Sequence, residues 1–233
     1  MFDFSKTTHL TFDCYGTLID WESGILGEMV PMLARYEITT PDEAILRLYA
    51  ELEAEEERGP YRPYREILIS VSAKIAAHFG VELVGSDRSS LPDSVGKWPV
   101  FADTVDALQR LKVRFKLVIL SNIDDDMFAQ TARHLYVEFD EVITAQQVRS
   151  YKPGKAHFET ALLRLGAPRE SILHVAQSLY HDHVPAKEME FSTAWIDRPS
   201  KLPHTGLSIP AFVEPDLTFT DLVSLADAVE KTT

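Results

Sequence analysis

The sequence predicts an α/β protein: a Rossmann-like, doubly wound parallel sheet with an inserted, all-helical subdomain. Short apolar runs bounded by turn residues recur along the chain, and segments with helical periodicity separate them. This alternation is typical of parallel βαβ units. A long stretch of helical periodicity after the first apolar run, with no convincing strand in it, predicts the insert.

The five predicted strands lie, in order, within "HLTFD", "FKLVILSN", "FDEVITA", "SILHVAQS" and "STAWIDR". The helices between them are predicted within "TVDALQRLKV", "MFAQTARHLY" and "KAHFETALLRLG", where apolar residues return every three or four positions. The core domain is therefore expected to comprise residues 1–20 and 97–233.

The inserted helical subdomain is predicted over residues 21–96. It contains the amphipathic stretches "GILGEMVPMLARYE", "PDEAILRLYAELEAEEERG" and "YREILISVSAKIAAHFG", and the chain leaves it through "LPDSVGKWPVFADT". The Glu-rich "ELEAEEER" is interpreted as the exposed face of a helix, without a function.

Composition limits the class of partner and the compartment. A 233-residue chain that is 45% hydrophobic can bury a sizeable core, and its formal charge of -13 disfavours nucleic acid and anionic membranes as partners. One cysteine, Cys14, excludes an intramolecular disulfide and fits a reducing compartment. No secretion signal or bilayer-spanning run is recognised, so the expected location is the cytoplasm.

Polar residues follow the predicted strands where each strand ends. Asp13 follows the first, Ser121 and Asn122 the second, Lys152 lies shortly after the third, and Asp182 after the fourth. Ligands of an open parallel sheet bind beyond the carboxyl ends of its strands. Each of these residues, taken alone, could have an ordinary structural role in a turn, a helix cap or a loop, and for most of them that role is the better explanation. Together, at the ends of successive strands, they predict one site.

Four of these segments resemble, in order, the motifs of the haloacid dehalogenase superfamily: "FDCYGTLID", "LVILSN", "YKPGK" and "HVAQSLYHD". The resemblance covers nearly the whole chain, and the helical insert resembles the small cap domain of that superfamily. The phosphatases of that superfamily have the first motif DxDxT, whose second Asp protonates the leaving group. Here Tyr15 stands in the place of that Asp. The resulting pattern, DxYGT, resembles the first motif of the L-2-haloacid dehalogenases.

The exchange of a carboxyl for a phenol has a chemical meaning. A halide leaves as a weak base and needs no general acid, whereas cleavage of a phosphate ester would lose its proton donor. The fourth motif offers only Asp182 as a carboxylate, where phosphatases place more acids for magnesium. The resemblance therefore implies a reaction without a metal or cofactor.

The resemblance also implies roles for the site residues. Asp13 would attack carbon and form an ester that water hydrolyses, Lys152 would keep Asp13 ionised, and Asp182 would hold Lys152. Thr17 would hydrogen-bond the nucleophile. The substrate carboxylate would bind Ser121 and the amides of Cys14 and Tyr15, with Asn122 reaching either that carboxylate or the departing group.

Three departures from the dehalogenase pattern leave parts of the site open. Gln177 and Ser178 stand in for a Ser-Asn pair with the register off by about one residue, so the group that positions water is not fixed. Phe158 replaces a tyrosine and is interpreted as a core aromatic. The halide-accepting arginine of the cap is assigned to Arg47 by pattern, with Arg62 and Arg65 as rivals.

Histidines near the motifs have commonplace interpretations. His157 is expected to be an exposed helix residue. His181 and His183 flank Asp182, but with no third ligand at suitable spacing they predict a helix start rather than a metal site.

The function predicted is hydrolysis of a small 2-haloalkanoic acid to the 2-hydroxy acid, with a small carboxylate as partner and homodimerisation left open. The alternatives are hydrolysis of another 2-substituted carboxylate, such as opening of a strained ring, a magnesium-dependent phosphatase of small molecules, and a binding module of the same fold without turnover.

Overall fold

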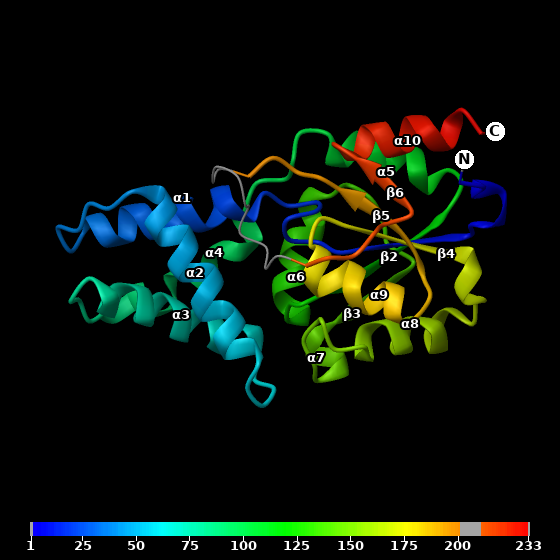
Figure 1. The fold of residues 1–233 in the computed structure, drawn as a ribbon. Coiled ribbons are helices and arrows are strands. Elements are labelled where there is room, and N and C mark those ends of the chain that lie inside the picture. Colours follow the sequence, from blue (N-terminus) through cyan, green and yellow to red (C-terminus); the bar gives the residue numbers. More distant parts are fainter. Residues whose placement is uncertain (1, 201–210, 233) are drawn as a thin grey trace.

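The computed structural model describes residues 2–200 and 211–232 and contains one six-stranded, fully parallel sheet (Figure 1). The strand order is β3-β2-β1-β4-β5-β6, the order of doubly wound nucleotide-binding folds. The strands are β1 (His9–Phe12), β2 (Lys116–Ser121), β3 (Glu141–Thr144), β4 (Ile172–Ala176), β5 (Ser192–Ile196) and β6 (Leu217–Phe219). The predicted fold class is confirmed; β6 was not predicted.

Helices cover both faces of the sheet (Figure 1). Leu117 and Ile119 pack on the side of α5 (Thr104–Lys112) and α10 (Leu222–Glu230), whereas Val118 and Leu120 pack on the side of α8 (Ala156–Leu165) and α9 (Val184–Glu188). Successive residues of a strand point to opposite faces, so a strand buried on both faces is apolar throughout. The short helices α6 (Asp125–Thr131) and α7 (Ala145–Val148) follow β2 and β3.

The helical insert lies between β1 and α5 in the sequence and to one side of the sheet in space (Figure 1). It contains α1 (Trp21–Ala34), α2 (Asp42–Glu57), α3 (Tyr64–His78) and α4 (Ser90–Ser94). The predicted insert is thus confirmed, and its boundaries at residues 20 and 97 stay predictions. Among the described residues, no helix combines the length and apolarity that crossing a bilayer would require.

A core loop fixes the start of helix α3. The Asp124 carboxylate, 4% exposed after strand β2, accepts hydrogen bonds from the amides of Tyr64 (3.0 Å) and Arg65 (2.9 Å). These amides have no partner within the helix, and a carboxylate also favours the positive end of the helix dipole. The Tyr151 hydroxyl donates to the Arg62 carbonyl at 2.7 Å. Core side chains therefore hold the insert over the carboxyl end of the sheet.

Candidate active site

Asp13 lies one residue beyond the central strand β1. Phe12 pairs with Ile119 of β2 on one side and Val175 of β4 on the other, so the sheet fixes the backbone before the carboxylate. Gly16 then adopts φ +97°, a conformation that L side chains rarely adopt. The turn brings Thr17 back to Asp13, with the Thr17 hydroxyl donating to Oδ2 at 2.8 Å.

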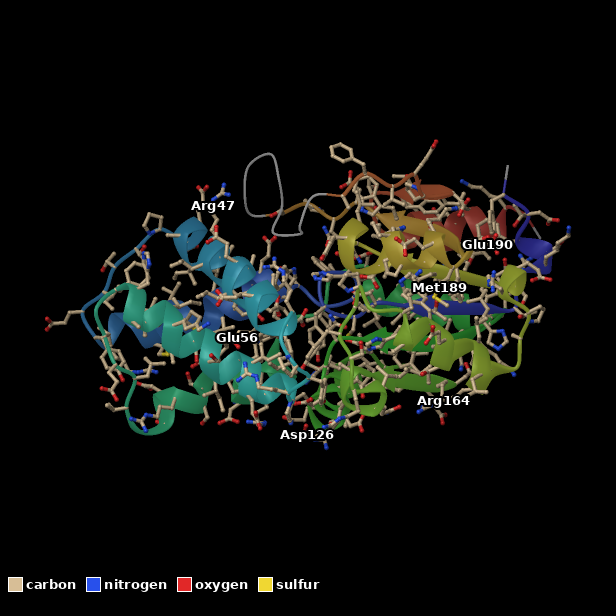
Figure 2. The ribbon with its side chains drawn as sticks, turned by 60° about the horizontal axis from the view of Figure 1, so that its bottom comes forward. Arg47, Glu56, Asp126, Arg164, Met189 and Glu190 are labelled. Carbon is tan, nitrogen blue, oxygen red and sulfur yellow. The ribbon has the colours of Figure 1, made fainter. Side chains whose placement is uncertain are left out.

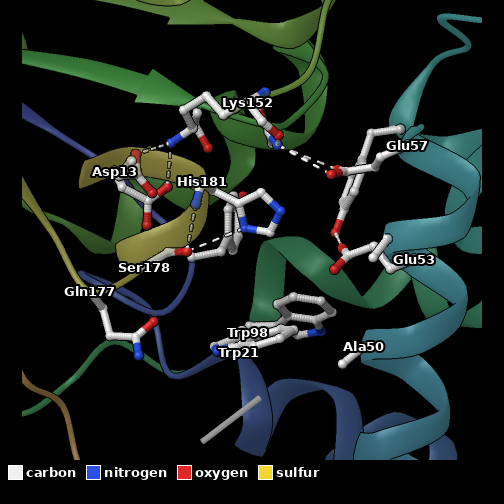
Figure 3. Close-up of a pocket in the computed structure, with 16 residues that line it drawn as sticks. Asp13, Trp21, Ala50, Glu53, Glu57, Trp98, Lys152, Gln177, Ser178 and His181 are labelled. Carbon is white, nitrogen blue, oxygen red and sulfur yellow. Dashed lines mark hydrogen bonds and ion pairs between the residues drawn. The ribbon is translucent and has the colours of Figure 1, made fainter. Parts of the chain in front are cut away.

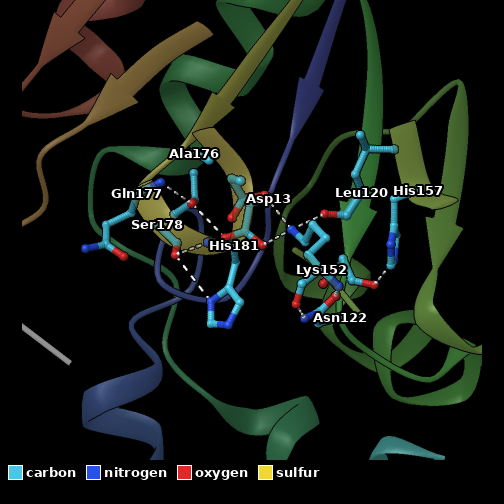
Figure 4. A network of polar contacts seen from close by, with 12 residues as sticks. Asp13, Leu120, Asn122, Lys152, His157, Ala176, Gln177, Ser178 and His181 are labelled. Carbon is cyan, nitrogen blue, oxygen red and sulfur yellow. Dashed lines mark hydrogen bonds and ion pairs between the residues drawn. The ribbon is translucent and has the colours of Figure 1, made fainter. Parts of the chain in front are cut away.

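Lys152 joins the two predicted carboxylates (Figure 4). Its ammonium lies 2.9 Å from Asp13 Oδ1, 2.6 Å from Asp182 Oδ1 and 2.9 Å from the Leu120 carbonyl. The three acceptors use the three protons of the ammonium. The structure thus brings together side chains from the ends of β1 and β4 and from the segment after β3.

The charges in this cluster are unequal. Burial alone would lower the pKa of Lys152, but Asp13 and Asp182 outweigh it, and the pKa ends above its ordinary value. Burial acts to raise the pKa of Asp182, yet Lys152 and His174 bring it well below the usual range. For Asp13, burial prevails over Lys152 and raises the pKa. The pKa of Asp182 is therefore lowered and that of Asp13 raised, although both carboxylates bind the same ammonium.

His174 supports Asp182 from inside the sheet. Its Nε2 lies 3.0 Å from Asp182 Oδ1, and its Nδ1 lies 2.9 Å from the Thr11 hydroxyl. All three side chains are buried. An Nδ1 that accepts from the hydroxyl leaves the Nε2 proton for the carboxylate, so Thr11 can set the histidine tautomer. His174 was not predicted from the sequence because it occupies one more position of a core strand.

The loop after β4 contains a π-helical turn, Leu179–His183. The amides of Asp182 (3.2 Å) and His183 (3.3 Å) both donate to the Ser178 carbonyl, and the Ser178 side chain accepts from the His181 amide at 3.1 Å. A π turn holds one more residue than an α turn. With this winding, Asp182 still reaches Lys152, at 2.6 Å.

Gln177 and Asn122 fasten the neighbouring loops. The backbone N–H of Gln177 donates to Thr17 Oγ1 at 2.9 Å, so Thr17 links the first and fourth motifs. Asn122 accepts from the Lys152 amide at 2.7 Å and donates to the Lys152 carbonyl at 3.1 Å. Asn122 therefore positions the backbone of Lys152, and Asn122 itself also lines the cavity.

A cavity of about 80 Å³ opens beside Asp13, between the sheet and the helical insert (Figure 3). Because an engineered cavity of about 150 Å³ holds one benzene, this space suits a small ligand. Predicted site residues that line it are Asp13, Tyr15, Ser121, Asn122, Lys152, Gln177, Ser178 and Asp182. Unpredicted ones are Trp21, Ala50, Glu53, Ala54, Glu57, Tyr64, Trp98 and His181.

Arg47 does not reach this cavity. Its guanidinium is 50% exposed and pairs with Glu43 one turn earlier at 2.7 Å, and Figure 2 shows it projecting outward from the insert. The expectation that Arg47 binds substrate is therefore wrong, because its helical position faces solvent. Its rivals also lie elsewhere: Arg62 pairs with Glu56, and Arg65 pairs with Asp93 at 2.6 Å.

Two Glu residues of "ELEAEEER" correct the interpretation of that segment. Glu53 and Glu57 line the cavity, whereas Glu51 and Glu55 are exposed. Residues four apart share one helix face, so the spacing of Glu53 and Glu57 could have indicated that both face the cavity. The spacing was not recognised because glutamates occur on every side of this helix.

The side chain of His157 is buried where an exposed one was expected, whereas the side chain of Cys14 is buried as expected. His157 is fully buried, with Nε2 3.2 Å from the Ser121 carbonyl, so the expectation of an exposed residue was wrong. The Cys14 side chain is packed in the core, as its strand-end position predicts. Among the described residues, the amides of Cys14 and Tyr15 donate to no other protein group.

A metal is a poor match for this donor set. Asp13 and Asp182 both bind the Lys152 ammonium. Within residues 2–200 and 211–232, no three His, Cys, Asp or Glu side chains are grouped to hold a metal ion. We therefore derive no step through a metal.

Comparison with known proteins shows that the protein with this sheet and this buried carboxylate–lysine–carboxylate cluster is a hydrolase. The family model described as haloacid dehalogenase-like hydrolase matches residues 7–176. The chain belongs to that family.

Within this family, the chain is similar to 2-haloacid dehalogenases. The (S)-2-haloacid dehalogenase of Pseudomonas sp. (strain YL) is 30% identical over 194 residues, covering 81% of this chain and 82% of the relative. That of Pseudomonas putida is 28% identical over 199 residues, covering 81% and 84%. The solved L-2-haloacid dehalogenase from Xanthobacter autotrophicus has a TM-score of 0.83 at 22% identity, covers 97% of this chain and 100% of that chain, and supports the fold.

Proposed function

We propose that this hydrolase converts small 2-haloalkanoic acids into 2-hydroxy acids and halide, without a metal, through an ester on Asp13. The observation that supports this most is the bridge of Lys152 between Asp13 and Asp182. It fixes an ionisable carboxylate at the cavity wall, with one oxygen bound by Lys152 and the other by Thr17.

In the first step, an Asp13 oxygen attacks carbon 2 and the carbon–halogen bond breaks with its electron pair on the halide. Attack at carbon 2 forms an aspartyl ester. In the second step, water attacks the ester carbonyl, which releases the 2-hydroxy acid, restores Asp13 and yields one proton. Lys152 stays close to the charge that develops on Asp13 in this step.

The substrate carboxylate would bind Ser121 and the amides of Cys14 and Tyr15. Ser121 lines the cavity and is 1% exposed, and its hydroxyl has no hydrogen-bond partner in the described part of the chain. Such a buried orphan hydroxyl is costly unless a ligand satisfies it. The small cavity further favours short acyl chains.

A phosphatase is supported less well. The residue that would supply its proton donor is Tyr15, and the Tyr15 hydroxyl pairs with Thr131 Oγ1 at 2.8 Å. Burial raises the pKa of Tyr15 well above its ordinary value. The phenol therefore has neither the acidity nor the freedom of a catalytic acid.

Halide release from EDTA-treated protein tests the proposal, with both enantiomers of 2-chloropropanoate, 2-bromopropanoate and chloroacetate as substrates. We expect release by the wild type and by Asp106→Asn, a matched exposed aspartate on α5, and none by Asp13→Asn. Phosphate release from a small phosphomonoester that requires magnesium, without halide release, would contradict it. No turnover with either class would favour a binding module.

A further inference from the structure

We propose that Glu57, in its protonated form, donates a hydrogen bond to the departing halide from the cavity wall opposite Asp13. The inference rests on the proposed function, because it assigns the leaving-group contact of the same site. An enzyme that releases an anion is expected to place a cation near the leaving group, but here two glutamates, Glu53 and Glu57, line the cavity.

Cationic side chains offer no free donor to a halide here. Lys152 is the only Lys or Arg of the described residues that lines the cavity. Its ammonium is saturated by Asp13, Asp182 and the Leu120 carbonyl. A halide must therefore find another donor.

Glu53 and Glu57 occupy the wall where a leaving group would depart. Figure 3 shows them on α2, across the cavity from Asp13. In a displacement at carbon, the leaving group moves away on the side opposite the nucleophile. A substrate placed between Asp13 and α2 would thus direct its halogen toward these carboxyls.

The two carboxyls are not equivalent. Glu53 accepts hydrogen bonds from the hydroxyls of Tyr49, at 2.9 Å, and Tyr64. Glu57 has only long contacts of 3.4 and 3.5 Å with the Asn122 amide. Two phenol donors stabilise the ionised form of Glu53, and the resulting charge disfavours ionisation of its neighbour. Burial raises the pKa of Glu53 as well, but the two phenol donors oppose this, whereas the pKa of Glu57 is raised well above its ordinary value. Of the two carboxyls, Glu57 is therefore the one that keeps its proton.

The surroundings of Glu57 support this assignment. Burial first, and then the Glu53 charge, raise the pKa of Glu57 well above its ordinary value, against the attraction of Lys152. The titratable groups that line the cavity or interact with Glu57 are Asp13, Tyr15, Tyr49, Glu53, Tyr64, Tyr151, Lys152, His181 and Asp182.

Ser121 independently indicates how a ligand lies. Ser121 lines the same cavity at the end of β2, and its buried hydroxyl has no partner in the described part of the chain. A carboxylate bound there leaves carbon 2 beside Asp13 and the halogen toward α2. During displacement the carbon–halogen electron pair goes to the halide, and Glu57 keeps its proton and contributes only the hydrogen bond.

Bromide binding to the free enzyme tests the donor without turnover, through the fluorescence of Trp21 and Trp98, which line the cavity. Bromide affinity is measured at pH 6 and at the highest pH at which the protein stays folded, and we expect wild-type affinity to be lower at the higher pH, because an ionised Glu57 offers no donor. Glu57→Gln keeps an N–H donor and should bind equally at both pH values. Glu57→Ala should bind about 10- to 100-fold more weakly at pH 6, the usual worth of a hydrogen bond to an ion.

Two further variants complete the binding test. Glu53→Gln should move the loss of affinity to lower pH, because the neighbouring charge is gone. Arg47→Ala, on the same helix but outside the cavity, should behave as wild type. Absent bromide binding at both pH values, or wild-type pH dependence in Glu57→Gln, would overturn the proposal.

Turnover gives a second readout that a structural role would not affect. The loss of kcat in Glu57→Ala should be larger for chloride than for bromide as leaving group, because chloride accepts the stronger hydrogen bond. An equal loss for both halides would contradict a direct contact. If bromide binds as expected but no haloacid is turned over, the proposed function fails while the halide site stands.

Discussion

The Lys152 ammonium lies 2.6 Å from Asp182 Oδ1, and both side chains are 1% exposed. Desolvating two charges costs several kcal/mol each unless their remaining hydrogen bonds are also satisfied. Here Asp13, the Leu120 carbonyl and His174 satisfy them. The ion pair is therefore stable only while all of these partners are present, and the same contacts hold Asp13 in place.

Replacing Lys152 with Met should lower the free energy of unfolding by about 3–5 kcal/mol, because two buried carboxylates lose their counter-charge. Urea unfolding measures the change. The control Lys155→Met removes a lysine whose side chain is 44% exposed, and its cost should stay below about 1 kcal/mol. If Lys152→Met is as stable as the wild type, the carboxylates are neutral and the charge assignment is wrong.

Buried neutral histidines should make stability depend on pH. Burial, the largest cause, lowers the pKa of His157 to about 3 and that of His183 to about 4, and both Nδ1 atoms lack a partner in the described structure. Unfolded histidines take up protons below about pH 6.5. The unfolded state then binds more protons, so stability is retained above pH 6.5 and lost as the pH falls toward 4.

Each histidine should contribute up to about 1.4 kcal/mol per pH unit in this window. Denaturant unfolding of His157→Gln between pH 4.5 and 7.5 should show a slope that is shallower than wild type by one such contribution. His78→Gln, an exposed histidine at the end of α3, serves as control and should keep the wild-type slope. An unchanged slope in His157→Gln would mean that His157 is protonated or accessible in the folded protein.

Asp124→Ala should loosen the helical insert, because the first amides of α3 lose their acceptor. We expect a loss of about 1–2 kcal/mol in the free energy of unfolding, as for other helix caps. Hydrogen exchange at Tyr64 and Arg65 should also become faster. Asp126→Ala, an exposed neighbour 4.0 Å from Arg65, should change neither. Equal protection in both variants would show that Asp124 does not hold the insert.

Much of the fold could be predicted because apolar periodicity reports burial directly. Strands β1, β2 and β4 are buried throughout or nearly so, and their ends placed Asp13, Ser121 and the fourth motif at one edge. Strand β6 has three residues, none of them buried, and thus lacks the apolar run that marks a strand. Short edge strands depend on their neighbour, which the local sequence does not report.

The cap side of the site could not be predicted for a different reason. Arg47 and Glu57 both lie on α2, and only the packing of that helix on the core decides which of them faces the cavity. Likewise, the sequence "SLYHD" does not reveal that a π turn carries Asp182 to Lys152. Residues on a helix acquire roles from tertiary packing, whereas residues at strand ends acquire them from topology.

A single turnover in oxygen-18 water, with enzyme in excess over substrate, decides whether Asp13 becomes an ester. We expect mass spectrometry to find the label in the peptide containing Asp13, and unlabelled oxygen in the 2-hydroxy acid, because water attacks the ester carbonyl. Label in the product alone, together with activity in Asp13→Asn, would contradict the account.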